Sequence, residues 1–239
     1  MFVTFSSCSN RFRLSSAVVV PMDVAAIRRW QAVQTMENHP VQSIDSGSAL
    51  NTTCAVLLAA GGGSRFTGSS HKLVALLRGR PVYQWSLDAV ASADLAHVIV
   101  VTCSVDLELP NWVIRAQNTD WASGQASSLQ RGVAIAKGLG AEAVVVGLAD
   151  QPFVMASAWR AVAHAPQPIA VATYRGERGH PVRLHRSVWA DLASEGDQGA
   201  RSLMALRPEL VGEVACEGSA ADVDTMEDLQ QWNSSTNLL

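Results

Sequence analysis

Three successive glycines followed by two basic residues form the stretch of this sequence that is best suited to chemistry. Gly61, Gly62 and Gly63 directly follow an apolar segment, and Arg65 and Lys72 come shortly afterwards. Glycines let a backbone approach a ligand closely, and successive N–H groups in such a loop point at phosphate oxygens. A guanidinium and an ammonium group supply positive charge where a triphosphate is negative. The stretch predicts a triphosphate loop, and a βα turn without a ligand is the plainer alternative.

Two common phosphate-binding loops do not match this stretch. The dinucleotide fingerprint G-x-G-x-x-G, counted from Gly61, requires glycine where Phe66 stands. The Walker A loop G-x-x-x-x-G-K, counted from Gly63, requires lysine where Ser69 stands. The sequence therefore excludes both of these loops.

A carboxylate follows another apolar segment of strand length. Asp150 comes two residues after Ala143–Leu148. The carboxyl ends of parallel strands meet at one edge of a sheet, so Asp150 is expected to face the glycine loop. A carboxylate beside a triphosphate is repulsive unless a divalent cation lies between them, and Mg²⁺ takes one or two carboxylates together with phosphate oxygens. Asp150 is thus a candidate metal ligand, and a turn-forming aspartate is the plainer alternative.

Apolar segments of strand length alternate with helical patterns throughout the chain beyond residue 53. The predicted strands are residues 54–59, 96–102, 112–115, 143–148 and 169–172. The predicted helices are residues 81–93, 124–139, 156–164 and 226–232. Such alternation implies right-handed crossovers and a mainly parallel sheet. We therefore predict an α/β fold, a Rossmann-like three-layer αβα domain.

Composition and charge indicate which partners and which cellular compartment are compatible with the sequence. The 239 residues are 48% hydrophobic and carry a net charge of −3, so no basic field attracts nucleic acid or an anionic membrane. No apolar run reaches the ~20 residues of a membrane span. Four cysteines without C-x-x-C spacing argue against a zinc site or a disulfide framework. We predict a cytoplasmic protein.

The first 53 residues differ in character from the rest. Residues 1–21 are rich in serine and arginine and contain no acidic residue. Their single apolar run, residues 17–20, is too short for the core of a secretory signal. We predict that residues 1–53 form a disordered or loosely attached extension, with a transit peptide as the alternative, and that residues 54–239 form the domain.

Six motifs occur in an order that resembles one known family. They are Leu58-Ala59-Ala60-Gly61 with Arg65 and Lys72, Asn118–Leu129, Leu148–Pro152, Gly179-His180-Pro181, Gly196–Arg201 and Asp222–Thr225. From about Cys54 to Trp232, the sequence resembles the MobA-like nucleotidyltransferases, most closely the molybdenum cofactor cytidylyltransferases. The resemblance implies a mixed sheet of the nucleotide-diphospho-sugar transferase type.

The resemblance also implies an activity. A family member of this kind uses Mg²⁺ to transfer CMP from CTP to the terminal phosphate of molybdopterin or the molybdenum cofactor, and pyrophosphate leaves. A molybdoenzyme or its maturation factor is a further implied partner. Ala59-Ala60 resembles the cytidylyl branch more than the guanylyl branch. The alternatives are guanylyl transfer from GTP to molybdopterin or to a small phosphorylated acid, and a non-catalytic nucleotide- or cofactor-binding module that hands cofactor to a molybdoenzyme.

The same resemblance implies the site residues, which are the residues of this sequence at the family's functional positions. The implied catalytic residues are Arg65, Lys72 and Asp150, and the implied metal ligands are Asp150 and Asp224. The implied nucleotide-binding residues are Leu58, Ala59, Ala60, Gly61, Gly62, Gly63, Ser64, Arg65, Lys72, Asn118, Gly124, Ser127, Ser128 and Asp150. The implied acceptor-binding residues are Gln151, Gly179, His180, Pro181 and Arg201.

Three of the motif residues also have structural interpretations. Asp197 precedes Gly199-Ala200-Arg201 in a pattern typical of a helix N-cap, so capping competes with acceptor contact. His180 is equally typical of a loop histidine whose hydrogen bonds are satisfied internally. Thr225 is a reasonable N-cap for the last predicted helix, so the segment around Asp224 could serve only to shape a turn.

Overall fold

A computed structural model describes residues 52–61, 65–67, 70–103 and 105–234 of the chain. The predicted extension lies outside these residues except for its last two positions, and the predicted domain boundary stays a prediction. Gly62, Gly63 and Ser64 also lie outside the described residues. Thr53 already belongs to the first strand of the sheet.

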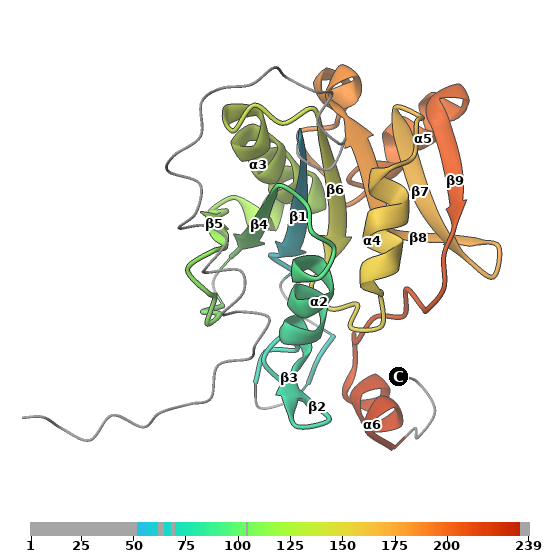
Figure 1. The fold of residues 1–239 in the computed structure, drawn as a ribbon. Coiled ribbons are helices and arrows are strands. Elements are labelled where there is room, and N and C mark those ends of the chain that lie inside the picture. The colour runs from blue at the N-terminus through green and yellow to red at the C-terminus, as the bar shows by residue number, and fades with distance from the viewer. Residues whose placement is uncertain (1–51, 62–64, 68–69, 104, 235–239) are drawn as a thin grey trace, which may run out of the picture. The chain divides into compact units, whose positions relative to one another are not determined.

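The core of the described chain is a seven-stranded mixed sheet (Figure 1). Its spatial order is β5-β4-β1-β6-β8-β7-β9. β8 runs antiparallel to both of its neighbours, and every other pair in this sheet is parallel. The strands are β1 (Thr53–Ala59), β4 (His97–Thr102), β5 (Ile114–Gln117), β6 (Ala143–Leu148), β7 (Ile169–Tyr174), β8 (Glu177–His185) and β9 (Val211–Ala215). A separate hairpin joins β2 (Leu76–Leu77) to β3 (Arg80–Pro81).

Helices cover both faces of the sheet and make three layers (Figure 1). Alternate residues of β1 point to opposite faces. Its even-numbered residues from 54 to 58 belong to the core under α3, and its odd-numbered residues from 55 to 59 to the core under α2 and α4. The helices are α2 (Val82–Ala91), α3 (Gln125–Gly138), α4 (Ala156–Ala163), α5 (Arg201–Leu206) and α6 (Met226–Ser234). Short 3₁₀ helices are η3 (Trp121–Ser123), η4 (Arg186–Asp191) and η5 (Pro208–Leu210).

The predicted three-layer fold with a mixed sheet is confirmed, but two strands of the seven-stranded sheet and both strands of the short hairpin were not predicted. β8 contains charged residues, glycine and proline near its start, and β9 is a partly exposed edge strand. β5 begins two residues later than expected. None of the described helices is long and apolar enough to cross a membrane.

Of the two roles considered for Asp197, helix capping is wrong. α5 begins four residues later, its N-cap is Ala200, and no side chain caps it. The reason is that Gly199 takes a positive φ and turns the chain once more before the helix starts. Asp197 instead lies close to Gly124, since a Cβ atom added to that glycine would stand 2.7 Å from Asp197 Oδ1.

Candidate active site

The parallel pairing of β1 and β6 brings the first two motifs to one edge of the sheet. The strands pair from Thr53↔Ala143 to Leu58↔Leu148, so both end at the same level. The backbone N–H of Ala149 continues this ladder by donating to Leu58 O at 2.9 Å. Asp150 therefore lies at the same edge of the sheet as the chain that leaves β1 after Ala59.

The start of α6 returns to the same edge. The N–H of Val223 donates to Asp150 O at 2.9 Å, which holds the segment before the helix against the end of β6. A reciprocal capping box then begins the helix: Asp228 N donates to Thr225 Oγ1 at 3.1 Å, and Thr225 N donates to Asp228 Oδ2 at 2.8 Å. Asp224 N donates to the same carboxylate at 3.1 Å. The cap predicted for Thr225 is present, and it fixes the backbone of Asp224.

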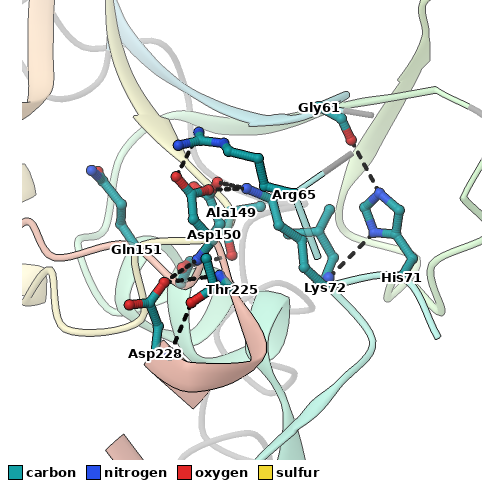
Figure 2. Close-up of polar contacts among 12 residues, drawn as sticks. Gly61, Arg65, His71, Lys72, Ala149, Asp150, Gln151, Thr225 and Asp228 are labelled. Carbon is teal, nitrogen blue, oxygen red and sulfur yellow. Dashed lines mark hydrogen bonds and ion pairs between the residues drawn. The ribbon is translucent and has the colours of Figure 1, made fainter. Parts of the chain in front are cut away.

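Lys72 contacts the carboxylates of both Asp150 and Asp224, and Figure 2 shows Lys72 together with Asp150. Its Nζ atom is 2.6 Å from Asp150 Oδ2 and 2.6 Å from Asp224 Oδ1. The side chain of Lys72 is 10% exposed. Burial alone would lower the pKa of Lys72, but the charges and hydrogen bonds of Asp150 and Asp224 raise it above its ordinary value. The lysine therefore stays charged at neutral pH.

Arg65 completes this charge cluster from the solvent side. Its guanidinium lies 2.7 Å from Asp224 Oδ2, and its side chain is 75% exposed. Asp222 lies nearby, and burial followed by the charge of Asp224 raises its pKa. The geometry thus distinguishes the two aspartates of this motif, because the contacts of Lys72 and Arg65 are to Asp224.

Asp150 and Asp224 are suited to bind a divalent cation, because they are carboxylates and one of their oxygens has no hydrogen-bond partner among the described residues. Asp150 Oδ1 is buried and has no hydrogen-bond partner among the described residues. A carboxylate oxygen in that state is suited to a ligand that brings positive charge. The described residues contain no group of three or more His, Cys, Asp or Glu that could enclose a metal ion. The arrangement therefore fits an ion that shares two carboxylates with nucleotide phosphates rather than an ion held by protein alone.

His71, which immediately precedes the lysine, contacts the chain on both sides. Its Nδ1 atom accepts the N–H of Leu73 at 3.2 Å, and its Nε2 atom lies 3.1 Å from Gly61 O. Since Nδ1 is an acceptor, Nε2 carries the proton and donates to the carbonyl. Burial lowers the pKa of His71, and the charge of Lys72 acts in the same direction, so the ring is neutral. Sequence analysis assigned this residue no role.

The residues expected to bind the base form one hydrogen-bonded group at the start of α3. Asn118 Nδ2 lies 2.9 Å from both Ser127 Oγ and Ser128 Oγ. Gly124 is the N-cap of the helix, and its φ of 109° favours glycine. A Cβ atom there would also stand 2.5 Å from the backbone of Gly196. The structure brings these four predicted residues together.

A cavity of about 260 Å³ lies between α3, α5 and the central strands. Gly179, His180 and Arg201 line it, with Leu58 from β1 and Gln125 from α3. Burial, and then the charge of Arg201, lower the pKa of His180 to about 4, so its ring is neutral at pH 7. The sheet contributes four buried aliphatic side chains to the walls of the cavity: Val146, Val171, Val182 and Leu184. Three of the five predicted acceptor residues therefore share one cavity.

The other two predicted acceptor residues lie elsewhere. Pro181 is not part of the lining of this cavity. Gln151 is 7% exposed, and its Nε2 atom donates to Ala220 O at 2.8 Å, which ties the end of β6 to the segment before α6. Two lining residues, Gln125 and Gln198, were not singled out from the sequence. Both stand inside motifs that were recognised, and that position is the one signal that could have marked them.

Comparison with known proteins now assigns the family. The family model described as "MobA-like NTP transferase domain" matches residues 55–213. The chain belongs to this family. It is 30% identical over 191 residues to the purine catabolism protein PucB of Bacillus subtilis, and the match covers 72% of this chain and 92% of PucB. The predicted resemblance is thereby confirmed, and the chain is a nucleotidyltransferase of the MobA-like family.

Solved structures agree with this assignment. Rv0371c of Mycobacterium tuberculosis H37Rv superposes with a TM-score of 0.67 at 25% identity, covering 78% of this chain and all of that one. A structure of Rv0371c in complex with manganese superposes with a TM-score of 0.61 at 26% identity, covering 77% of this chain and 99% of that one.

Proposed function

We propose that this protein transfers CMP from CTP to the terminal phosphate of molybdopterin or the molybdenum cofactor and releases pyrophosphate. The observation that carries the proposal is the position of the Lys72 ammonium, 2.6 Å from both Asp150 and Asp224, at the edge of the sheet where β1 and β6 end. A module that only stores a nucleotide has no need for two carboxylates and a buried lysine at the phosphate end. We therefore favour turnover over a non-catalytic role.

The proposed cofactor is a divalent ion, and we propose Mg²⁺, held by Asp150 and Asp224. The unpartnered Oδ1 atom of Asp150 supports this choice. So does the manganese complex of the mycobacterial relative. A bound ion would supply charge neutralisation between the carboxylates and the nucleotide phosphates.

The proposed reaction is an in-line displacement at the α-phosphorus of CTP. An oxygen of the acceptor phosphate forms the new bond to phosphorus, the bond to the bridging oxygen breaks, and its electron pair leaves with pyrophosphate. Negative charge grows on the departing oxygens, so positive groups that contact them lower the barrier. Arg65, which is mostly exposed, and Lys72, which stays charged, would supply that charge.

The cavity beside His180 is the proposed place of the acceptor. Its aliphatic walls, its neutral imidazole and the Arg201 guanidinium suit a molecule with an uncharged body and an anionic group. For the nucleotide, we propose that the small side chain of Ala60, which lies on the α3 face of the sheet, leaves room for the base beside the hydrogen-bonded start of α3. The resemblance of Ala59-Ala60 to the cytidylyl branch supports CTP.

Pyrophosphate release tests the proposal. The full-length protein is incubated with Mg²⁺ and each of the four nucleoside triphosphates, with molybdopterin, with its molybdenum-loaded form and with neither. We expect release with CTP and acceptor at a rate at least about tenfold above that with GTP, the factor that about 1.4 kcal/mol of discrimination provides. A preference for GTP would replace cytidylyl by guanylyl transfer. Saturable CTP binding without any release would favour the non-catalytic module.

A further inference from the structure

The histidine that precedes Lys72 occupies a position that links two parts of the site. Gly61 is the second residue after β1, and Lys72 lies in the turn that begins directly after His71. One imidazole ring contacts Gly61 and Leu73, the residue after Lys72, donating to Gly61 O at 3.1 Å and accepting from Leu73 N at 3.2 Å (Figure 2). Ten positions separate His71 from Gly61, so the ring links two segments that are distant in the chain.

We propose that His71 is a positioning residue, whose hydrogen bond to the carbonyl of Gly61 holds Lys72 at the phosphate end of the nucleotide site. The inference rests on the proposed function for the identity of the ligand, but the bond itself can be tested without nucleotide. The neutral ring that burial favours can make both hydrogen bonds, whereas a ring also protonated at Nδ1 could still donate to Gly61 O but could not accept the N–H of Leu73.

A purely local role is the competing explanation. The carbonyl of His71 accepts the N–H groups of Val74 and Ala75 at 3.0 and 3.2 Å, so the residue begins a helical turn. Its Nδ1 atom caps that turn through Leu73 N. A residue that only capped the turn would not need its second nitrogen. The contact of Nε2 with Gly61 O is the feature that distinguishes the two roles.

Two substitutions separate these roles because each keeps one of the two hydrogen bonds. His71→Asn places an oxygen near the position of Nδ1, so it can still cap the turn, but it is too short to reach Gly61 O. His71→Gln places an amide nitrogen near the position of Nε2, so it can still donate to Gly61 O. His97→Asn is the matched control, because His97 is an exposed histidine at the start of β4.

Labelling of amines reads out the position of Lys72 in the free protein. The sequence contains two lysines, Lys72, which is buried, and Lys137, which is exposed near the end of α3. Each variant is acetylated at pH 8, and the rate at Lys72 is divided by the rate at Lys137, which serves as an internal reference. We expect His71→Asn to raise this ratio about tenfold, the factor expected from one lost hydrogen bond, while His71→Gln and His97→Asn stay within about threefold of the wild type.

Binding of each nucleoside triphosphate with Mg²⁺, measured without acceptor, gives the functional readout. The dissociation constant of the preferred nucleotide is expected to rise about tenfold in His71→Asn and to be largely retained in His71→Gln. Equal labelling ratios in His71→Asn and the wild type would overturn the proposal, and so would a His71→Gln variant as impaired as His71→Asn. If the wild type binds no nucleotide, the proposed function fails, while the labelling ratio still decides the role of His71.

Discussion

Replacing Lys72 by methionine tests the charge balance of the site most directly. Methionine fills much of the same volume, so the main change is the loss of the ammonium group between Asp150 and Asp224. Their side chains are 17% and 15% exposed, so neither carboxylate is well solvated. Removing one partner of a buried ion pair costs about 3–5 kcal/mol. Arg65 still contacts Asp224, so we expect the lower end, about 3 kcal/mol.

The expected loss is measurable by thermal unfolding. A domain of this size loses about 2–4 °C of melting temperature per kcal/mol, so Lys72→Met should melt about 6–12 °C below the wild type in EDTA. The pKa of Lys72 is raised, so its stabilising effect is fully present below the ordinary value of 10.5. The gap between the two proteins should therefore be constant at neutral pH and narrow only as the pH rises through the folded pKa.

A divalent ion should reverse the deficit, because it supplies the charge that the variant lacks. In the wild type the ammonium already neutralises the same two carboxylates, so Mn²⁺ or Mg²⁺ is expected to raise the melting temperature of Lys72→Met more than that of the wild type. An ion at about 100 times its dissociation constant adds about 2.7 kcal/mol. Lys137→Met is the control, because that lysine is exposed at the end of α3. Wild-type stability of Lys72→Met, or equal metal shifts in both proteins, would refute the reasoning.

Three further predictions concern other parts of the site. Asp150→Asn and Asp224→Asn should each abolish most pyrophosphate release without unfolding the protein, and the double variant should lose little more, because groups that act as a unit are not additive. Gly124→Ala places a side chain at a positive φ and against the backbone of Gly196, so it should weaken nucleotide binding in a titration. Its control is Gly138→Ala, whose added Cβ meets no neighbour within 4 Å. That variant should bind nucleotide normally, and its free energy of unfolding in denaturant should rise by about 0.5 kcal/mol. Since the folded pKa of His180 is about 4, stability should fall by up to about 3 kcal/mol as the pH drops from 6.5 to 4, and unfolding of His180→Gln should lack this loss.

The elements that form the edge of the sheet where β1 and β6 end could be predicted from the sequence, because their hydrophobic patterns are long and regular. Cys54–Ala59 and Ala143–Leu148 are continuous apolar runs, and the residues of α3 keep one apolar face. β8 and β9 were missed for a physical reason. β8 gains its stability from pairing with β6 and β7, which no local pattern records, and its start carries Glu177, Arg178 and Gly179.

The site could be predicted only in part. The meeting of Asp150 with the loop after β1 follows from the rule that parallel strands share a carboxyl edge. The position of Asp224 came from the family pattern alone. The placement of Lys72 on the two carboxylates was not foreseen, because the sequence analysis assigned this lysine to the triphosphate. The two contacts of His71 were missed as well, because they depend on how a loop closes, and sequence spacing does not specify that.

The bond between Lys72 and Asp224 joins residues 152 positions apart, and this separation has a consequence for biosynthesis. A growing polypeptide that has been translated as far as β8 already contains the ammonium and the first carboxylate, but not the second. The balance of charge is completed only when the last helix, α6, has been synthesised and its capping box has formed. Contacts of such long range form late, after the central strands have paired. Truncated chains that end before Asp224 therefore cannot assemble this charge cluster, however well their sheet folds.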